Sequence, residues 1–268
     1  MMEDQRAVFA SCEELLGGGG EEGWKAPEWT SPEVEMSMKY FPPKKGERSI
    51  ATGKAVGVVD CSAEEVAAWA MDNCSNERLR ISKEIGNLAA LELREKARVN
   101  ERSFAAVSKF SFFLDNREFL FRMIWRSEEG KVMVAFESVG DEVDYGVKLK
   151  KVRAFTRALW QIEDLPVRGG AKQCRVTHVL QVDAGGVIPT WLVDKKVPQA
   201  LGVVQRAIDE FRQDEKVDAA ELREKATFMR GKWQDEVYSE EENALLERVR
   251  QKFEGSRARE EGGEIKQS

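Results

Sequence analysis

The stretch "GGVIPTWLVDKK", Gly185 to Lys196, joins two different sequence periodicities. The segment before it, "CRVTHVLQVD", alternates and is rich in β-branched residues, which is typical of a strand. Apolar residues after it recur every three or four positions and predict an amphipathic helix ending near Phe211. Pro198 lies inside this pattern, so the helix either begins near Val197 or bends. Contiguous apolar side chains need a partner surface, so we expect the last strand of a sheet to turn here into a helix that covers that sheet.

Strand patterns also precede this stretch. They are "IATGKAVGVVDCS" (50–62), "REFLFRMIWRSEEGKVMVAFESVG" (117–140) and "VRAFTRALWQIED" (152–164). The second is a predicted hairpin with its turn at "SEEG", and another hairpin is expected around Asn100. Between the first two, Ser62 and Glu65 form a capping box that predicts the start of a short helix. The order of elements indicates an α+β domain with one antiparallel sheet.

The chain divides into four predicted regions. Residues 1–47 are interpreted as a flexible N-terminal arm, because a short helical pattern up to Leu16 is followed by the run "GGGG". Residues 48–213 carry the strand and helix patterns of the domain. Residues 214–254 form a charged helical extension, and residues 255–268 are expected to be a disordered tail.

The composition narrows the classes of function. The 268 residues carry a net charge of -6, which argues against nucleic acid as a partner. The four cysteines are scattered, which favours reduced thiols over a disulfide framework. No apolar run is long enough to cross a bilayer, and the acidic N-terminus does not resemble a secretion signal. We expect a cytoplasmic protein that associates peripherally with membranes.

Three motifs together resemble the START lipid-transfer domain. They are Arg117-Glu118-Phe119 at a strand start, Val152-Arg153-Ala154 in a later strand, and the segment from Val182-Asp183 to Trp191. The resemblance covers roughly residues 48–213, and the last motif is the most specific. It implies a helix-grip fold, in which a curved antiparallel sheet wraps a long C-terminal helix and a ligand tunnel runs between them. Gly185 and Gly186 would permit the sharp reversal, Asp183 would accept hydrogen bonds from the turn amides, and Ile188 and Trp191 would anchor the helix.

The resemblance also suggests which residues bind the ligand. The expected ligand-binding residues are Phe119, Phe121, Met123, Trp125, Val179, Val197, Leu201, Val204 and Ile208. The pattern alone favours a filled core for these side chains, and only the resemblance makes a ligand tunnel an equal alternative. The expected gate and membrane contacts are Lys148, Lys150, Lys151, Trp191, Lys195 and Lys196. The alternative is that these residues belong to an ordinary solvated surface.

One departure from the family affects the choice of ligand. Sterol-carrying members place an arginine at the position of Met123 and pair it with an acid near the position of Phe104. Both positions are apolar in this chain, so a charge pair for a sterol hydroxyl is not supported. Phospholipid, sterol or another hydrophobic molecule all remain candidate ligands.

Catalysis has little support in the sequence. His178 is the only histidine, and it lies in a strand pattern without acid or nucleophile partners. No cluster of ligating residues indicates a metal, and no cofactor is expected.

Three functions are therefore compared. The first is non-catalytic binding of a lipid, with transfer between membranes. The second is a scaffold that binds a protein through an apolar stripe in the helical tail, formed by Leu222, Ala226, Met229 and Trp233. The third is a cyclase or hydrolase on the same fold. A cavity above about 300 Å³ would favour the first over the second.

Overall fold

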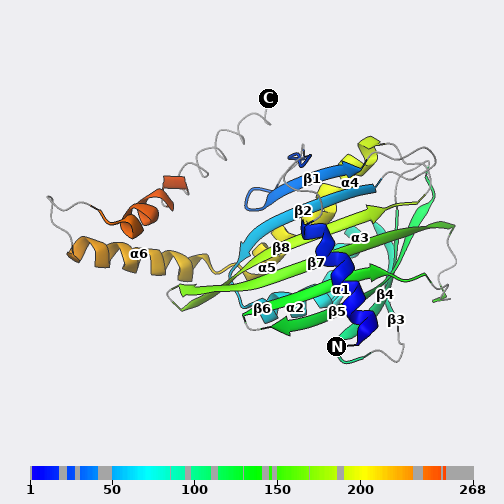
Figure 1. The fold of residues 1–268 in the computed structure, drawn as a ribbon, viewed down its shortest axis with the longest axis horizontal. Coiled ribbons are helices and arrows are strands. Elements are labelled where there is room, and N and C mark those ends of the chain that lie inside the picture. Colours follow the sequence, from blue (N-terminus) through cyan, green and yellow to red (C-terminus); the bar gives the residue numbers. More distant parts are fainter. Residues whose placement is uncertain are drawn as a thin grey trace. The chain divides into compact units, whose positions relative to one another are not determined.

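One eight-stranded sheet dominates the computed structural model of the chain (Figure 1). Neighbouring strands pair antiparallel in the order β1-β2-β8-β7-β6-β5-β4-β3. The strands are β1 Glu35–Phe41, β2 Ile50–Val59, β3 Asn87–Leu93, β4 Glu101–Ser108, β5 Asn116–Glu128, β6 Lys131–Ser138, β7 Lys151–Arg168 and β8 Ala171–Asp183. The structure describes residues 2–17, 23–27, 31–41, 50–84, 86–93, 98–109, 114–128, 130–140, 145–146, 150–168, 170–185, 190–231, 238–248 and 250–251.

Both predicted hairpins are present. β5 pairs with β6 across the "SEEG" turn, and β3 pairs with β4 across the segment that contains Asn100. The start of β5 also pairs in parallel with the start of β7, from Asn116 opposite Lys151 to Phe119 opposite Ala154. This extra pairing brings two of the family motifs together at one end of the sheet.

Four helices cover the inner face of the sheet: α2 Ala63–Met71, α3 Asn76–Glu84, α4 Thr190–Leu201 and α5 Val203–Phe211. The predicted capping box is confirmed, because the Ser62 hydroxyl accepts a hydrogen bond from the Glu65 amide and the Glu65 carboxylate accepts one from the Ser62 amide. Side chains from α2, α4, α5 and the strands form one buried cluster. The predicted α+β helix-grip architecture is confirmed.

Helices α4 and α5 pack directly on β2, where two glycines lie beneath them. A Cβ atom on Gly53 would lie 2.7 Å from Val197 Cγ1 and 2.9 Å from Leu201 Cδ1. A Cβ atom on Gly57 would lie 3.1 Å from Ile208 Cδ1. The helices therefore approach the backbone of β2 as closely as they do because these positions have no side chain.

The outer face of the sheet is covered by α1, Glu3–Gly17, which crosses in front of the strands in Figure 1. Its apolar side chains Val8, Phe9, Cys12 and Leu15 are buried against residues that include Leu159 and Val179. Together with the pairing of β1 on β2, this corrects the prediction of a flexible arm over residues 1–47. The amphipathic face of α1 gains burial on the sheet, which offsets the entropy lost on docking.

The decisive turn after β8 has the expected chemistry. The Asp183 carboxylate accepts a hydrogen bond of 2.9 Å from the Gly185 amide, as predicted. Gly185 has a φ of +69°, and a Cβ atom there would lie 2.5 Å from the Arg153 carbonyl oxygen, so only glycine fits. Gly186 and Ile188 lie outside the described residues. The helix begins at Thr190 rather than near Val197, and its interruption is at Gly202.

The C-terminal residues form a second unit, Ala219–Ser268, after a first unit that spans Met1–Asp218. Helix α6, Asp214–Gly231, confirms helix in the charged region. A second capping box joins Ser239 and Glu242 before another helical segment. The predicted disordered tail, residues 255–268, lies outside the described residues. Among the helices that the structure describes, none has the length and apolarity of a membrane span.

Candidate ligand-binding cavity

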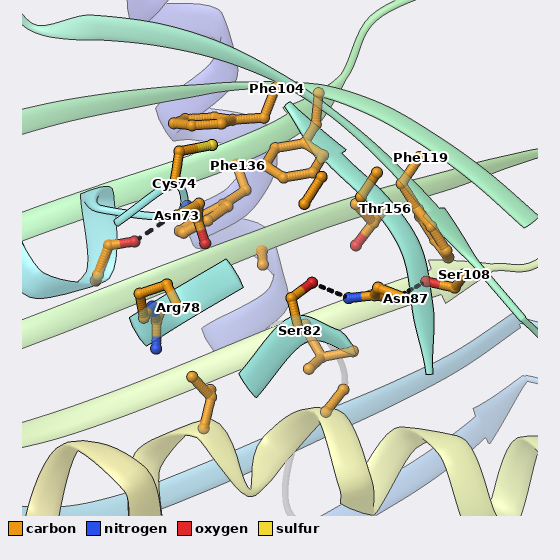
Figure 2. A pocket seen from close by; sticks show the side chains of 18 of the residues that line it. Asn73, Cys74, Arg78, Ser82, Asn87, Phe104, Ser108, Phe119, Phe136 and Thr156 are labelled. Carbon is orange, nitrogen blue, oxygen red and sulfur yellow. Dashed lines mark hydrogen bonds between the residues drawn. The ribbon is translucent and has the colours of Figure 1, made fainter. Parts of the chain in front are cut away.

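A cavity of about 360 Å³ lies between the inner face of the sheet and the helices (Figure 2). Its strand wall carries Phe104, Phe119, Phe121, Phe136, Ala158, Trp160 and Leu180. Its helix wall includes Ala70, Cys74 and Arg78 from the α2–α3 region, and Ala200, Val203 and Arg206 from α4 and α5. Most of these side chains are apolar, and small residues alternate with large ones. Side chains of the sheet and of the helices therefore both shape this cavity.

Aromatic rings hold one another in place along the strand wall. The Phe121 ring lies 5.9 Å from the Phe104 ring and 6.1 Å from the Phe136 ring, measured between centroids. The Trp160 ring lies 4.7 Å from the His178 ring on the neighbouring strand β8. These separations are typical of favourable aromatic pairs. The wall is thus a connected apolar surface against which an aliphatic or ring ligand can pack.

Several polar groups that line the cavity already have hydrogen-bond partners within the protein. The Asn87 side-chain amide donates to the Ser82 hydroxyl at 2.8 Å and accepts from the Ser108 hydroxyl (Figure 2). The Thr156 hydroxyl donates to the Gln181 carbonyl at 3.2 Å. Because these groups have partners within the protein, they can line the cavity without a large desolvation penalty.

His178 is neutral in this environment. Burial lowers the pKa of His178 to about 4, since the imidazolium form would be desolvated, while its Nδ1 lies 3.4 Å from the Leu159 carbonyl oxygen. Within the described ranges, no group of three or more His, Cys, Asp or Glu side chains is placed to hold a metal ion.

Comparison with known proteins places this geometry in a family. The family model for the START domain matches residues 10–216. The chain belongs to the START domain family. The match begins within α1, which agrees with the packing of the N-terminal helix on the sheet.

Solved START structures share the fold at low sequence identity. Human StAR-related lipid transfer protein 5 is 18% identical, with a TM-score of 0.57, over 78% of this chain and 98% of that one. Human STARD10 is 19% identical, with a TM-score of 0.53, over 78% of each chain. The lipid transfer and protein localization domain of human StarD13 is 17% identical, with a TM-score of 0.51, over 79% of this chain and 98% of that one. At these identities the likeness shows the fold alone, and a comparison with curated proteins found no match.

Two neighbouring residues of the Arg117-Glu118-Phe119 motif each bind a different part of the chain. The Arg117 guanidinium donates to the carbonyl oxygens of Ala184, at 2.5 Å, and Gly185, at 3.3 Å, so it fixes the turn before α4. The Glu118 carboxylate lies 2.8 Å from Lys151 Nζ and 2.8 Å from Arg153 Nε. Phe119, the third residue of the motif, lines the cavity.

Glu118 also ties down the segment before β7. The Tyr145 hydroxyl donates a hydrogen bond to the Glu118 carboxylate. Burial acts to raise the pKa of Glu118, but the hydrogen bonds from Lys151 and Tyr145 and the charge of Arg153 outweigh it, so the pKa is lowered. The ionised carboxylate is therefore the anchor of the predicted gate loop.

The predicted ligand-binding residues occupy three different environments. Phe119 and Phe121 line the cavity. Met123 is fully buried in the inner cluster without lining the cavity, and Trp125, near the end of β5, is 37% exposed. Val179 lies on the outer face beneath α1, because strand residues alternate and His178 and Leu180 take the inner face of β8. Met123, Trp125 and Val179 therefore do not line this cavity, and their contact with a ligand stays a prediction.

The helix face that was expected to bind the ligand also lies away from this cavity. Val197, Leu201, Val204 and Ile208 are buried, but they pack against β2 and do not line the cavity. The neighbouring helix face, with Ala200, Val203 and Arg206, faces the cavity instead. The physical reason is that the large side chains of the expected face pack over Gly53 and Gly57, where the helices approach the backbone of β2 most closely. This spacing of two glycines on one strand face was the signal available in the sequence.

Half of the predicted gate and membrane residues can be placed. Lys150 lies 3.1 Å from Asp115 and has a side chain that is 84% exposed, whereas Lys151 is engaged with Glu118. The Lys196 ammonium donates to the Gln199 side chain at 3.4 Å on the exposed side of α4. Lys148 and the side chains of Trp191 and Lys195 lie outside the described residues.

The sequence interpretation missed the contribution of the region from α2 to β4. Arg78, Ile81 and Ser82 of α3 line the cavity, as do Asn87 and Phe104 of the β3–β4 hairpin. Charged helices such as α3 are usually solvated, so their pattern gave no signal for a cavity wall. The alternation of β4 did indicate that Phe104 lies on one face with Ala106 and Ser108.

Proposed function

We propose that this START domain binds one hydrophobic ligand in the described cavity, without covalent chemistry, and carries it between membranes. The observation that supports the proposal most is the apolar cavity of about 360 Å³, which exceeds the lower bound of about 300 Å³ for ligand pockets. Each methylene group transferred from water into such a site contributes about 0.8 kcal/mol. The aromatic wall thus offsets the loss of the ligand's contacts with a bilayer.

Entry of the ligand requires a movement of the helices or of the neighbouring loop. We propose that α4 and the segment from Gly140 to Lys151 form the gate. Two local features support this assignment: the break in the helix at Gly202 and the hydrogen bond from Tyr145 to Glu118. The helix can bend at the first, and the second can break, without unfolding the sheet. A transient contact of Lys150 and Lys196 with a membrane surface belongs to the same proposal.

A vesicle-transfer assay tests the function. Donor vesicles carry a self-quenched fluorescent acyl lipid, and acceptor vesicles carry none. The expected result is a transfer rate that rises linearly with protein concentration and saturable binding of one lipid per chain. A rate no higher than that of spontaneous exchange, together with no saturable binding, would reject the proposal.

Protein binding by the C-terminal unit is a second candidate function. The support is the exposure of two large apolar side chains of α6, Leu222 at 67% and Met229 at 76%. Ala226 lies between them on the helix, and Trp233 lies outside the described residues. Replacing Leu222 and Met229 by serine is expected to abolish crosslinking to a protein partner in cells and to leave lipid transfer unchanged. Unchanged crosslinking in that variant would exclude this surface.

A further inference from the structure

Two arginines lie where the apolar cavity meets a second, polar hollow of about 350 Å³. Arg78 projects from α3 and Arg206 from α5. Among the described residues, only these two and Ile81 border both spaces. Any ligand whose chain lies in the cavity and whose head reaches the hollow must therefore pass these guanidinium groups.

Neither guanidinium forms an ion pair in the described part of the protein. No carboxylate oxygen there lies within ion-pair distance of either group, and the buried Nε of Arg206 has no hydrogen-bond partner. The Arg78 Nε donates to the Asp72 carbonyl oxygen at 3.1 Å, and its guanidinium lies 4.0 Å from the centroid of the Trp69 ring. Both contacts orient the group without forming an ion pair, and the nearby carboxylates of Asp72, Glu77 and Glu210 act on its charge only at longer range.

Neighbouring arginines on the same helices behave differently. Arg80 of α3 is paired with Glu77 and Glu84, and Arg212, directly after α5, is paired with Glu33 and Asp209. Burial, and next the positive charge of Arg206, outweigh the negative charges of nearby carboxylates and lower the pKa of Arg78 to about 10. Burial also lowers the pKa of Arg206. Two half-buried like charges destabilise the empty protein, because each loses hydration and they repel one another.

An anionic group between the arginines would remove this penalty. We propose that the cavity binds a single-chain amphiphile with a singly charged anionic head, with the head held by Arg78 and Arg206 and the chain lying against Phe104 and Phe136. The inference rests on the proposed function and adds the chemical class of the ligand. Guanidinium groups bind carboxylate and phosphate with paired, charge-assisted hydrogen bonds, so a fatty acid and a lysophospholipid both supply the required chemistry.

The dimensions of the site favour one chain over two. At about 30 Å³ per water-sized group, 360 Å³ holds on the order of twelve such groups, which is most of one acyl chain. The charge of the head is limited by the carboxylates around the polar hollow, Asp72, Glu77, Asp209 and Glu210, all at exposed positions. Two of them are already paired with Arg80 and Arg212. The remaining negative charge disfavours a head with two negative charges.

Affinities of three probes that share one oleoyl chain test the inference in the full-length chain after delipidation. The probes are oleate, lysophosphatidylglycerol and neutral mono-oleoylglycerol. We expect oleate or lysophosphatidylglycerol to bind at least tenfold more tightly than mono-oleoylglycerol, and the tighter of the two identifies a carboxylate or a phosphodiester head. Equal affinity for the neutral probe would overturn the inference and leave lipid binding intact. Absence of binding by all three would reject the proposed function itself.

Charge-removing variants locate the head-group site. Arg78→Gln and Arg206→Gln are each expected to weaken binding of the preferred anionic probe about tenfold, which is about 1.4 kcal/mol, and to leave mono-oleoylglycerol unchanged. The melting temperature of the delipidated variants should be unchanged or higher, since a partly buried charge without an ion pair is removed. Arg80→Gln on the same helix is the matched control and should change neither affinity. Equal weakening for all probes would overturn the assignment, and if a glutamine variant does not fold, the probe preference of the wild type decides.

Discussion

Filling the cavity from the strand side should stabilise the protein, and Ala158 is the position to change. Ala158 lies on β7, is 6% exposed, and lines the cavity beside Thr156 and Trp160. Ala158→Leu adds three carbon atoms to this wall. At about 0.8 kcal/mol per buried methylene, they contribute roughly 2 kcal/mol, and the rotamer entropy of leucine opposes this by about 0.5–1 kcal/mol. The net expectation is a gain of about 1–1.5 kcal/mol in the free energy of unfolding.

The sign of this change separates a cavity from a filled core. In a filled core, the same atoms would cause overpacking and lower the free energy of unfolding by about 1–3 kcal/mol. Ala135→Leu provides the matched control, because Ala135 lies on β6, is fully buried, and packs beneath α1 on the outer face. That variant should show the overpacking loss.

Urea unfolding of delipidated protein measures both effects. Ala158→Leu should shift the midpoint upward, Ala135→Leu should shift it downward, and only Ala158→Leu should weaken lipid binding by tenfold or more. If the two variants are destabilised to the same extent, the volume beside Ala158 is not available to a ligand and the reasoning is refuted.

Three further predictions concern stability. Burial lowers the pKa of His178 from about 6.5 to about 4, so the contribution of the neutral imidazole to stability is complete above pH 6.5. Roughly 3 kcal/mol of the free energy of unfolding is lost as the pH falls toward 4. His178→Gln should remove this part of the pH dependence of unfolding, and a variant with the wild-type slope would contradict the assignment. Gly53→Ala should lower the free energy of unfolding by about 1–3 kcal/mol, because the new Cβ atom would lie 2.7 Å from Val197. Gly140→Ala is the control and should have little effect, because no atom lies within 4 Å of its new Cβ atom. Equal urea midpoints for the two variants would argue against the close packing on β2. Truncation after Asp218, the end of the first unit, should leave thermal unfolding cooperative and lipid binding unchanged, and a broad transition would show that the domain needs the C-terminal unit.

The elements with local periodicity were predictable from the sequence. β5 and β6 follow from strict alternation, and the turn at Asp183 and Gly185 follows from the chemistry of those two residues. The docking of α1 was not predictable in the same way, because the following "GGGG" run is compatible with a tether whether or not the helix packs. Its stripe of Val8, Cys12 and Leu15 is amphipathic but does not identify the surface that it covers.

The cavity was less predictable than the sheet. The helical stripe through Val197 and Leu201 predicted burial correctly, but not whether its partner was a ligand or the backbone of β2. Arg78 and Arg206 gave no signal, since charged residues on helices are usually solvated. Their importance depends on which groups lie around them, and that is a property of the tertiary structure.

Native mass spectrometry of the delipidated protein can show whether the cavity holds one lipid-like ligand. Delipidated wild-type protein, Ala158→Leu and Ala135→Leu are each incubated with phosphatidylcholine vesicles that contain oleate and lysophosphatidylglycerol, and then separated from the vesicles. We expect one bound single-chain lipid per chain for the wild type and Ala135→Leu, and none for Ala158→Leu. A wild-type protein without a bound lipid, or an Ala158→Leu variant that retains as much lipid as the wild type, would contradict this expectation.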